Sequence, residues 1–284
     1  MDVQLPTCLT AHWLEINDFF NSVFFTAIAG SLAGAFAGAY GAQRIAERAK
    51  YRDQLLKEVR DTNAAIMVAF GVCNSLLSMK KQHVRSLKED FETQKTALLD
   101  HYKNRELGKI SKDEIFRFKA DLQTLSLPSL PVDILQKQVF EKLSLVGRPL
   151  SLTTMLSQTV HSLSASLEKR NQLIESYKAS DGFSPAQYFG LPLDGQVNQD
   201  YPSVIDAIYH QTDDGIFFSQ LLCKDLVEHG NQIVDQFKKH FKKGAPTISE
   251  TDFAKAEKSD LMPNADNYVD WFTMFVKRNT PTKE

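Results

Sequence analysis

The sequence predicts an all-α protein, with one transmembrane helix near the N-terminus followed by a long helix and a helical-bundle soluble domain. Three observations support this fold class. An uncharged stretch of 25 residues occupies positions 19–43. After it, apolar residues recur at spacings of three and four, which is the period of an amphipathic helix. Extended runs of β-branched residues, which are typical of strands, are missing from the 284 residues.

Composition argues against some classes of function. The formal net charge is -2 with 24% charged residues. A nucleic-acid-binding protein needs a basic excess for its phosphate contacts, so we do not expect nucleic acid as a partner. The cysteines, Cys8, Cys73 and Cys223, are far apart and odd in number. This is unlike a disulfide framework or a zinc site, and we interpret them as reduced structural thiols.

The uncharged stretch at residues 19–43 is long enough to cross a bilayer. With a rise of about 1.5 Å per residue, such a helix exceeds the roughly 30 Å hydrocarbon core. A buried helix of a soluble domain rarely stays uncharged on every face over this length. A cleaved signal peptide needs a basic leader, whereas residues 1–18 contain no Lys or Arg. We therefore expect a transmembrane helix over 19–43, surrounded by membrane lipid.

The charges that flank this stretch predict its orientation. The leader, residues 1–18, is acidic, and basic residues follow the span at Arg44, Arg48, Lys50 and Arg52. Positive charge accumulates on the cytoplasmic side of a membrane helix. We therefore expect a short non-cytoplasmic leader, a single pass through the cell inner membrane and a mostly cytoplasmic chain.

Small residues form a row inside the predicted span. Gly30, Gly34 and Gly38 repeat at every fourth position. Such a row lets two helix backbones approach closely, so that van der Waals contact drives their association in lipid. We predict a helix-association face here and a homo-oligomer. The alternative is that glycine is simply common in membrane helices.

A second uncharged stretch covers residues 62–79. Its 18 residues just suffice to cross a bilayer with little tilt. Five polar side chains interrupt it, namely Thr62, Asn63, Asn74, Ser75 and Ser78. Two alternatives stay open: a core helix within a long helix over 44–105, or the second arm of a two-span hairpin. The hairpin would place the rest of the chain on the opposite side of the membrane.

Residues 106–284 are expected to form a helical soluble domain. The long helix over 44–105 lacks proline and contains only Gly71, where we expect any break. A short amphipathic helix is predicted from Ile115, Phe118, Leu122 and Leu125. Further helices are predicted over 132–146, 156–177, 203–243 and 265–278.

The predicted helix over 156–177 has an apolar period of 3.5 residues, which indicates packing in a bundle or coiled coil. Arg170 occupies one of its apolar positions. We interpret Arg170 as a side chain that snorkels to solvent near the end of the seam. The alternative is a polar group that selects the register or the partner.

Two irregular regions, 179–202 and 244–264, interrupt the helical pattern. The first contains the aromatic residues Phe183, Tyr188, Phe189 and Tyr201. Loops of this length are usually functional or disordered, and the aromatic content argues against disorder. Two alternatives are open for these rings: contact with a protein partner, or packing onto the bundle.

No common catalytic motif is present. The sequence lacks a Walker loop, a dinucleotide glycine pattern, a nucleophile elbow and the usual zinc motifs. The closest acid and imidazole pairs are His210 with Asp213 or Asp214, and His229 with Asp225. Seven histidines among 35 acidic residues produce such neighbours by chance. We therefore expect no cofactor, no metal and no enzymatic activity.

These features favour a non-enzymatic membrane protein that acts through self-association of its span and protein contacts of its helical domain. Within this class we favour an effector that perturbs the membrane when triggered, as in toxin or antiviral defence modules; this is an analogy. One alternative is a passive membrane scaffold or adaptor that localises a cytoplasmic partner. Another is an anchored helical enzyme with an unrecognised site.

Overall fold

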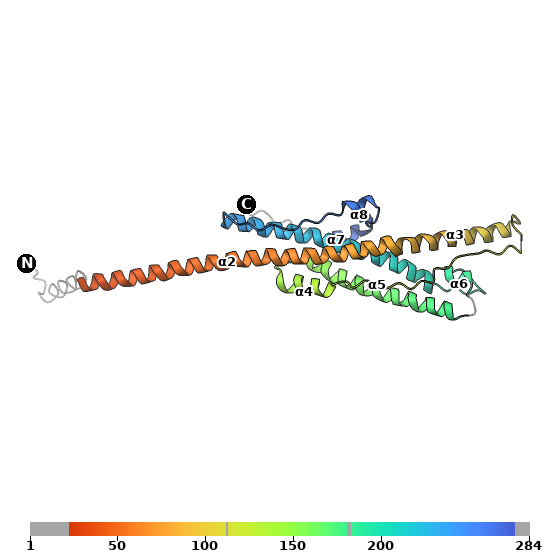
Figure 1. Cartoon of the computed structure of the whole chain (residues 1–284), viewed down its shortest axis with the longest axis horizontal. Coiled ribbons are helices and arrows are strands. Elements are labelled where there is room, and N and C mark those ends of the chain that lie inside the picture. Colours follow the sequence, from red (N-terminus) through yellow and green to blue (C-terminus); the bar gives the residue numbers. More distant parts are fainter. Residues whose placement is uncertain (1–22, 112, 181–182, 276–284) are drawn as a thin grey trace, which may run out of the picture. The chain divides into compact units, whose positions relative to one another are not determined.

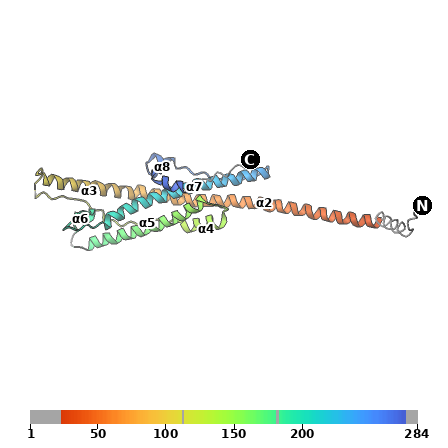
Figure 2. The same cartoon turned by 180° about the vertical axis from the view of Figure 1, so that it is seen from behind.

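The structure is a computed structural model that describes residues 23–111, 113–180 and 183–275 (Figures 1 and 2). Helices make up 74% of it and no strand is present in this part of the chain, which confirms the all-α class. The chain divides into two compact units, residues 1–56 and 57–284. The predicted leader and the first four residues of the predicted span lie outside the described residues.

The first unit contains the beginning of helix α2 (Val23–Met79). Residues 26–50 are all exposed, except for Gly41, which is partly buried. This part of α2 therefore has apolar side chains that no other described part of the chain covers.

The second unit begins within α2, which passes into the π-helix η1 (Lys80–Val84) and then into α3 (Arg85–Glu106). Helical structure thus continues through the predicted long helix at 44–105. The irregular turn is η1, whereas Gly71 lies inside regular α2. Gly71 is exposed, and no described residue packs where its side chain would be. A glycine in that position lowers helix propensity by about 1 kcal/mol, which does not break a helix that packs on its other side.

Two long helices complete the centre of this unit, α5 (Arg148–Ala179) and α7 (Asp200–His240). They pack along each other, and both lie beside the second-unit part of α2 in Figures 1 and 2. The shorter α4 (Val132–Lys142) packs on α5. Gly215 allows α7 to approach α2 closely, because a Cβ at this position would lie 2.7 Å from Leu76 Cδ1.

The predicted irregular regions are partly helical. Region 179–202 contains α6 (Pro185–Phe189), whose first turn is closed by a capping box between Ser184 and Gln187, and α7 already begins at Asp200. Region 244–264 contains α8 (Ala254–Lys258). The helix predicted over 265–278 is present as η2 (Ala265–Tyr268) and α9 (Val269–Thr273). Its last three residues lie outside the described chain.

The second uncharged stretch, residues 62–79, lies in the core of the second unit. Its fully buried side chains include Ala65, Ile66, Ala69, Val72, Cys73 and Leu76. They pack in one cluster with apolar residues of α4, α5 and α7. The structure therefore places this stretch where the first of the two alternatives, a core helix, requires it.

Residues 114–131 have no regular secondary structure, so the helix predicted from Ile115, Phe118, Leu122 and Leu125 is wrong. The sequence Phe-Arg-Phe-Lys-Ala-Asp-Leu at 116–122 alternates apolar and polar residues, which is the period of an extended chain. Phe116, Phe118, Ala120 and Leu122 pack against the aromatic core, whereas Arg117 and Lys119 are exposed. We call residues 116–125 the strap.

Candidate functional site

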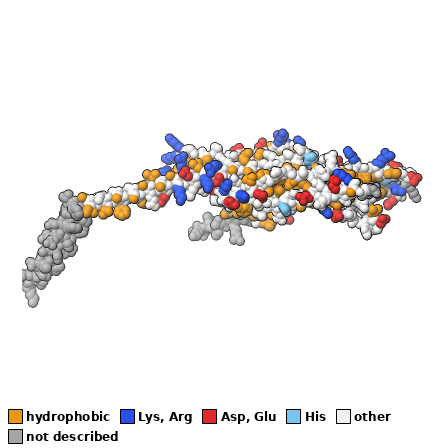
Figure 3. All heavy atoms as spheres, turned by 60° about the horizontal axis from the view of Figure 1, so that its bottom comes forward, with side chains coloured by type: hydrophobic (Ala, Val, Ile, Leu, Met, Phe, Trp, Pro, Cys, Tyr) orange, Lys and Arg blue, Asp and Glu red, His pale blue; other side chains and the backbone are white. Residues whose placement is uncertain are grey.

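The first candidate site is the uncovered apolar part of α2. Phe36 is 75% exposed and Leu32 is 53% exposed. On the face shown in Figure 3, the described beginning of the helix has no charged side chain, and Lys and Arg appear only after it. The guanidinium of Arg44 lies 5.0 Å from the centroid of the Tyr40 ring. An uncharged helix surface of this kind is typical of a segment that contacts lipid or another helix.

Residues Thr26–Glu106 form a helix that is long and apolar enough to cross a membrane. The apolar window of 18 residues on which this rests is half buried within the chain. Since residues 26–50 are not buried, this window lies farther along, over the stretch 62–79. Core helices and signal sequences also meet the same length and composition criteria. Burial therefore separates the two uncharged stretches better than hydropathy does.

The predicted association face lies on the uncovered part of α2. At Gly30, Gly34 and Gly38, a built Cβ meets no atom within 4 Å. The three glycines are thus open along one side of the helix, and no described residue of the chain fills the space in front of them.

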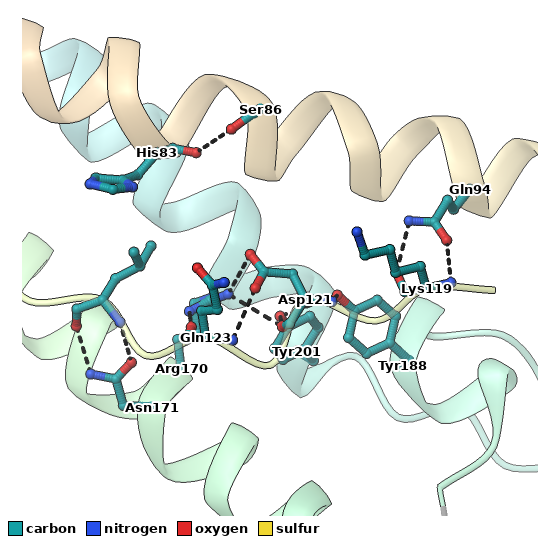
Figure 4. A network of polar contacts seen from close by, with 11 residues as sticks. His83, Ser86, Gln94, Lys119, Asp121, Gln123, Arg170, Asn171, Tyr188 and Tyr201 are labelled. Atoms are coloured by element: carbon teal, nitrogen blue, oxygen red, sulfur yellow. Dashed lines mark hydrogen bonds and ion pairs between the residues drawn. The ribbon is translucent and has the colours of Figure 1, made fainter.

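The second candidate site is the surface on which the strap lies, shown in Figure 4. We call this surface the seat; its polar groups belong to Gln94, Asn171, Arg170, Tyr188 and Tyr201. At one end, Gln94 of α3 holds the main chain of Lys119. Gln94 Nε2 donates to the carbonyl oxygen at 2.9 Å, and the Lys119 N–H donates to Gln94 Oε1 at 2.7 Å. At the other end, Asn171 of α5 holds Leu125 in the same way, at 2.7 Å and 3.0 Å. Each amide side chain donates one hydrogen bond to the strap and accepts one from it, as the main chain of a neighbouring strand would. We call the side chains of Gln94 and Asn171 the clamps.

Between these two clamps, Arg170 and two tyrosines bind the main chain of the strap. Arg170 Nη1 donates to the Gln123 carbonyl at 2.6 Å, and Nη2 lies 3.5 Å from the Asp121 carbonyl. The Asp121 N–H donates to Tyr188 Oη at 3.2 Å, and Tyr201 Oη donates to the Asp121 carbonyl at 3.4 Å. Burial raises the pKa of both tyrosines, so their hydroxyl groups stay protonated.

The interpretation of Arg170 as a snorkelling side chain is wrong, because Arg170 is 0% exposed. Its guanidinium does not reach solvent, since the strap covers it and supplies carbonyl acceptors. Nη2 also lies 3.3 Å from Asp121 Oδ2, and the side chain of Asp121 is 41% exposed. The Nε atom of Arg170 is buried and has no hydrogen-bond partner in the part of the chain that the structure describes.

The predicted partner-contact residues form the floor of this seat. Tyr188, Phe189 and Tyr201 are fully buried in a cluster with Phe91, and Phe183 is partly buried and stacks on Tyr177 at 4.6 Å between ring centroids. The structure places these rings as the packing alternative requires, because burial leaves the first three no surface for a partner. The strap and its clamps were missed from the sequence, although the alternation at 116–122 was a signal for them.

A third candidate is a polar cleft of about 830 Å³ beside α7. The predicted pair of His229 with Asp225 is not joined here: Arg148 Nε donates to Asp225 Oδ2 at 2.8 Å, and His229 Nε2 lies 3.0 Å from Glu58 Oε1. Ser144 Oγ also donates to Glu58, at 2.8 Å. A serine triad needs its histidine between the hydroxyl and the carboxylate, whereas here the carboxylate lies in the middle. This order gives Ser144 no general base.

Electrostatics in this cleft favour ion pairs that join secondary-structure elements. Burial alone would raise the pKa of Glu58, but hydrogen bonds from Ser144 and His229 outweigh it and lower this pKa. Hydrogen bonds to Asp225 raise the pKa of Arg148. Among the residues that the structure describes, no three metal-binding side chains come together.

The other predicted acid and imidazole pairs are also used in packing. Asp213 pairs with the buried Lys80 at 2.5 Å. Asp214 accepts a hydrogen bond from Tyr268 Oη at 2.9 Å, and burial raises the pKa of Asp214. Neither of these two contacts involves His210. Asp213 therefore joins η1 to α7, and Asp214 joins η2 to α7.

Comparison with known proteins assigns no family to the chain: no family model, no curated protein and no solved structure matches it.

Proposed function

We propose that this chain is a membrane-anchored, non-enzymatic helical protein whose segment 19–43 spans the bilayer once. The observation that carries the proposal is the uncharged, apolar beginning of α2, which nothing in the described chain covers. Exposing Leu32 and Phe36 to water would cost roughly 1.5–3 kcal/mol each relative to burial. Lipid removes this cost, and the helix satisfies its own main-chain hydrogen bonds, as the bilayer core demands.

A single pass is favoured over a two-span hairpin, because residues 62–79 are needed in the core of the second unit. Spanning the membrane with this stretch would remove Ile66, Val72 and Leu76 from their contacts with the other helices. It would also bring the polar side chains of Asn63 and Asn74 into hydrocarbon. The basic residues after position 43 favour a cytoplasmic second unit, and we propose the cell inner membrane as its location.

Membrane fractionation with a matched pair of variants tests the anchor. Leu32→Arg puts a charge near the middle of the proposed span, which costs about 2.5–3.5 kcal/mol of insertion free energy. Ile45→Arg makes the same change at a residue that is 73% exposed, just beyond the span. We expect the wild type and Ile45→Arg to resist carbonate extraction, and Leu32→Arg to be released. Release of all three chains, or of none, would contradict a span at 19–43.

Self-association is proposed to occur along the row of Gly30, Gly34 and Gly38, which is open in this chain. A β-branched side chain at the central glycine should keep the two backbones apart. We expect Gly34→Ile to lower the association signal in a membrane two-hybrid assay, and Leu32→Ile, which preserves bulk off the row, to leave it unchanged. Equal signals from both variants would remove the proposed face.

Within this class, the proposed activity is perturbation of the membrane by the associated spans once the cytoplasmic unit is triggered. A potential-sensitive dye in overexpressing cells measures it. We expect depolarisation with the wild type and none with Gly34→Ile. If the protein is instead a passive scaffold, its activity is unchanged when an unrelated single span replaces residues 19–43. Cells that overexpress a passive scaffold also do not depolarise.

A further inference from the structure

Most polar contacts of the seat are made with the main chain of the strap. Gln94, Asn171, Arg170, Tyr188 and Tyr201 all direct polar groups to the peptide units of residues 119, 121, 123 and 125. No main-chain to main-chain hydrogen bond joins residues 116–125 to the rest of the described chain. The clamped residues are alternate ones, and between them the apolar side chains of Ala120 and Leu122 point to the core. Peptide-binding grooves use this division: main-chain bonds give affinity, and pockets for alternate side chains give specificity.

The strap does not fill its seat. The floor residues, among them Phe91, Phe189 and Tyr201, are fully buried, whereas no described residue from 113 to 131 is. A cleft of about 440 Å³ runs beside strap residues 119–123, and another of about 350 Å³ adjoins Phe116. The first lies between the strap and α3, and the second lies between α3 and residues 113–116.

Arg170 shows most clearly that the strap does not satisfy every polar group of its seat. Among the described residues, none is a hydrogen-bond partner of its buried Nε, and its one carboxylate contact, to Asp121, is long at 3.3 Å. A guanidinium binds a carboxylate best through two parallel hydrogen bonds. The Asp121 side chain uses its other oxygen to accept from the Gln123 N–H, at 2.9 Å. A carboxylate that met the guanidinium side-on, through Nη2 and Nε, would satisfy this donor, and a glutamate side chain is one methylene longer than that of Asp121.

We propose that the seat is a binding groove for an extended segment of a partner protein, and that residues 116–125 occupy it within the chain until that segment displaces them. The chemistry of the partner segment follows from the seat. It carries aromatic side chains at the positions of Phe116 and Phe118, a small one at Ala120 and an aliphatic one at Leu122. At the position of Asp121 it carries glutamate, which pairs with Arg170 through both Nη2 and Nε. The groove does not depend on the proposed membrane span, since every residue of the seat belongs to the second unit.

A fluorescein-labelled peptide of residues 114–126 tests the groove by anisotropy on the full chain in nanodiscs. The strap is weakened by the double change Phe118→Ala and Leu122→Ala, which removes two partly buried side chains. The matched control is Arg117→Ala with Gln123→Ala, because both side chains are exposed. We expect the weakened chain to bind the peptide at least about tenfold more tightly than the wild type or the control, since its own occupant competes less.

Two further changes identify the contacts. Adding Gln94→Ala and Asn171→Ala to the weakened chain removes both clamps and should lower peptide affinity by at least about tenfold, the loss of several hydrogen bonds. A peptide with Asp121→Glu should bind more tightly than the parent peptide. The groove is overturned if the peptide does not bind a weakened chain whose circular dichroism is still helical. It is also overturned if peptide binding survives the loss of both clamps. Equal affinity of the two peptides overturns the preference for glutamate.

The wild type provides a test that does not depend on the folding of any variant. Excess peptide should speed amide hydrogen exchange in the chain's own residues 116–125 and leave exchange in α5 unchanged. Unchanged exchange in the strap at peptide concentrations that saturate anisotropy would overturn displacement. If the weakened chains instead form dimers that unlabelled peptide does not dissociate, the occupant is the strap of a second copy and the partner proposal fails.

Discussion

Replacing Arg170 by methionine should release the strap and destabilise the second unit. The fully buried guanidinium donates to the Gln123 carbonyl at 2.6 Å, and a hydrogen bond of this charge-assisted kind contributes about 1.5–3 kcal/mol. The ion pair with Asp121 adds at most about 1 kcal/mol, because the carboxylate is 41% exposed and screened by solvent. Methionine recovers part of this loss by filling the space with apolar atoms. We therefore expect the free energy of unfolding to fall by about 1–3 kcal/mol.

Urea unfolding in detergent micelles, followed by circular dichroism at 222 nm, measures this change. Chymotrypsin provides a second, local readout, because a released strap exposes Phe116 and Phe118 to cleavage. The matched control is Lys178→Met on the same helix. Lys178 pairs with Glu175 at the surface, where both side chains are largely exposed. Such a pair is expected to contribute no more than about 0.5 kcal/mol.

Two results would refute this reasoning. The first is a urea midpoint for Arg170→Met that equals that of Lys178→Met. The second is an unfolding free energy that falls as expected while cleavage at Phe116 and Phe118 is no faster than in the wild type. That combination would mean that Arg170 stabilises the helices directly and that the strap is held by Gln94 and Asn171 alone.

Three other perturbations follow from the buried polar groups. Lys80→Met leaves the Asp213 carboxylate without its buried partner, so the free energy of unfolding should fall by about 3–5 kcal/mol, seen as a lower urea midpoint. The pKa of Glu58 lies below its ordinary value of 4.5, so its contribution to stability is present above that pH and disappears as the pH falls through the folded-state pKa. Glu58→Gln should therefore flatten the acid side of a stability curve measured against pH, and an unchanged curve would contradict the lowered pKa. Burial raises the pKa of Cys73 to about 11 and also that of Cys223, so neither thiol should react with iodoacetamide at pH 8 until urea unfolds the chain; labelling of the folded chain at either thiol would contradict their burial.

The long helices were predictable because their signal is local. Leu156, Val160, Leu163 and Leu167 recur at steps of four and three, and all four are buried in α5. A helix forms its main-chain hydrogen bonds within its own segment, so periodicity alone identifies it. The helical class of the protein followed from repeated instances of this pattern.

The strap was not predictable in the same way, because its hydrogen bonds come from residues far along the chain. Lys119 is clamped by Gln94, 25 positions away, and Leu125 by Asn171, 46 positions away. Gln94 and Asn171 are polar residues within predicted helices, and no sequence pattern marks such amide side chains as clamps for a distant main chain. The apolar residues of the segment also fit a helical spacing if Ile115 is counted and Phe116 is not, and Ile115 is in fact exposed.

The two uncharged stretches of the long helix show what hydropathy does and does not determine. Both lack charge, and the more apolar window belongs to the stretch that is half buried in the chain. What separates them is the partner available to each. The stretch 62–79 carries Ile66 and Leu76 on a face that α5 and α7 cover, and Gly215 makes the room for it. The stretch 26–43 carries Leu32 and Phe36 on a surface that no described helix covers, which is why we propose lipid and a second copy of the same helix as its complementary surface.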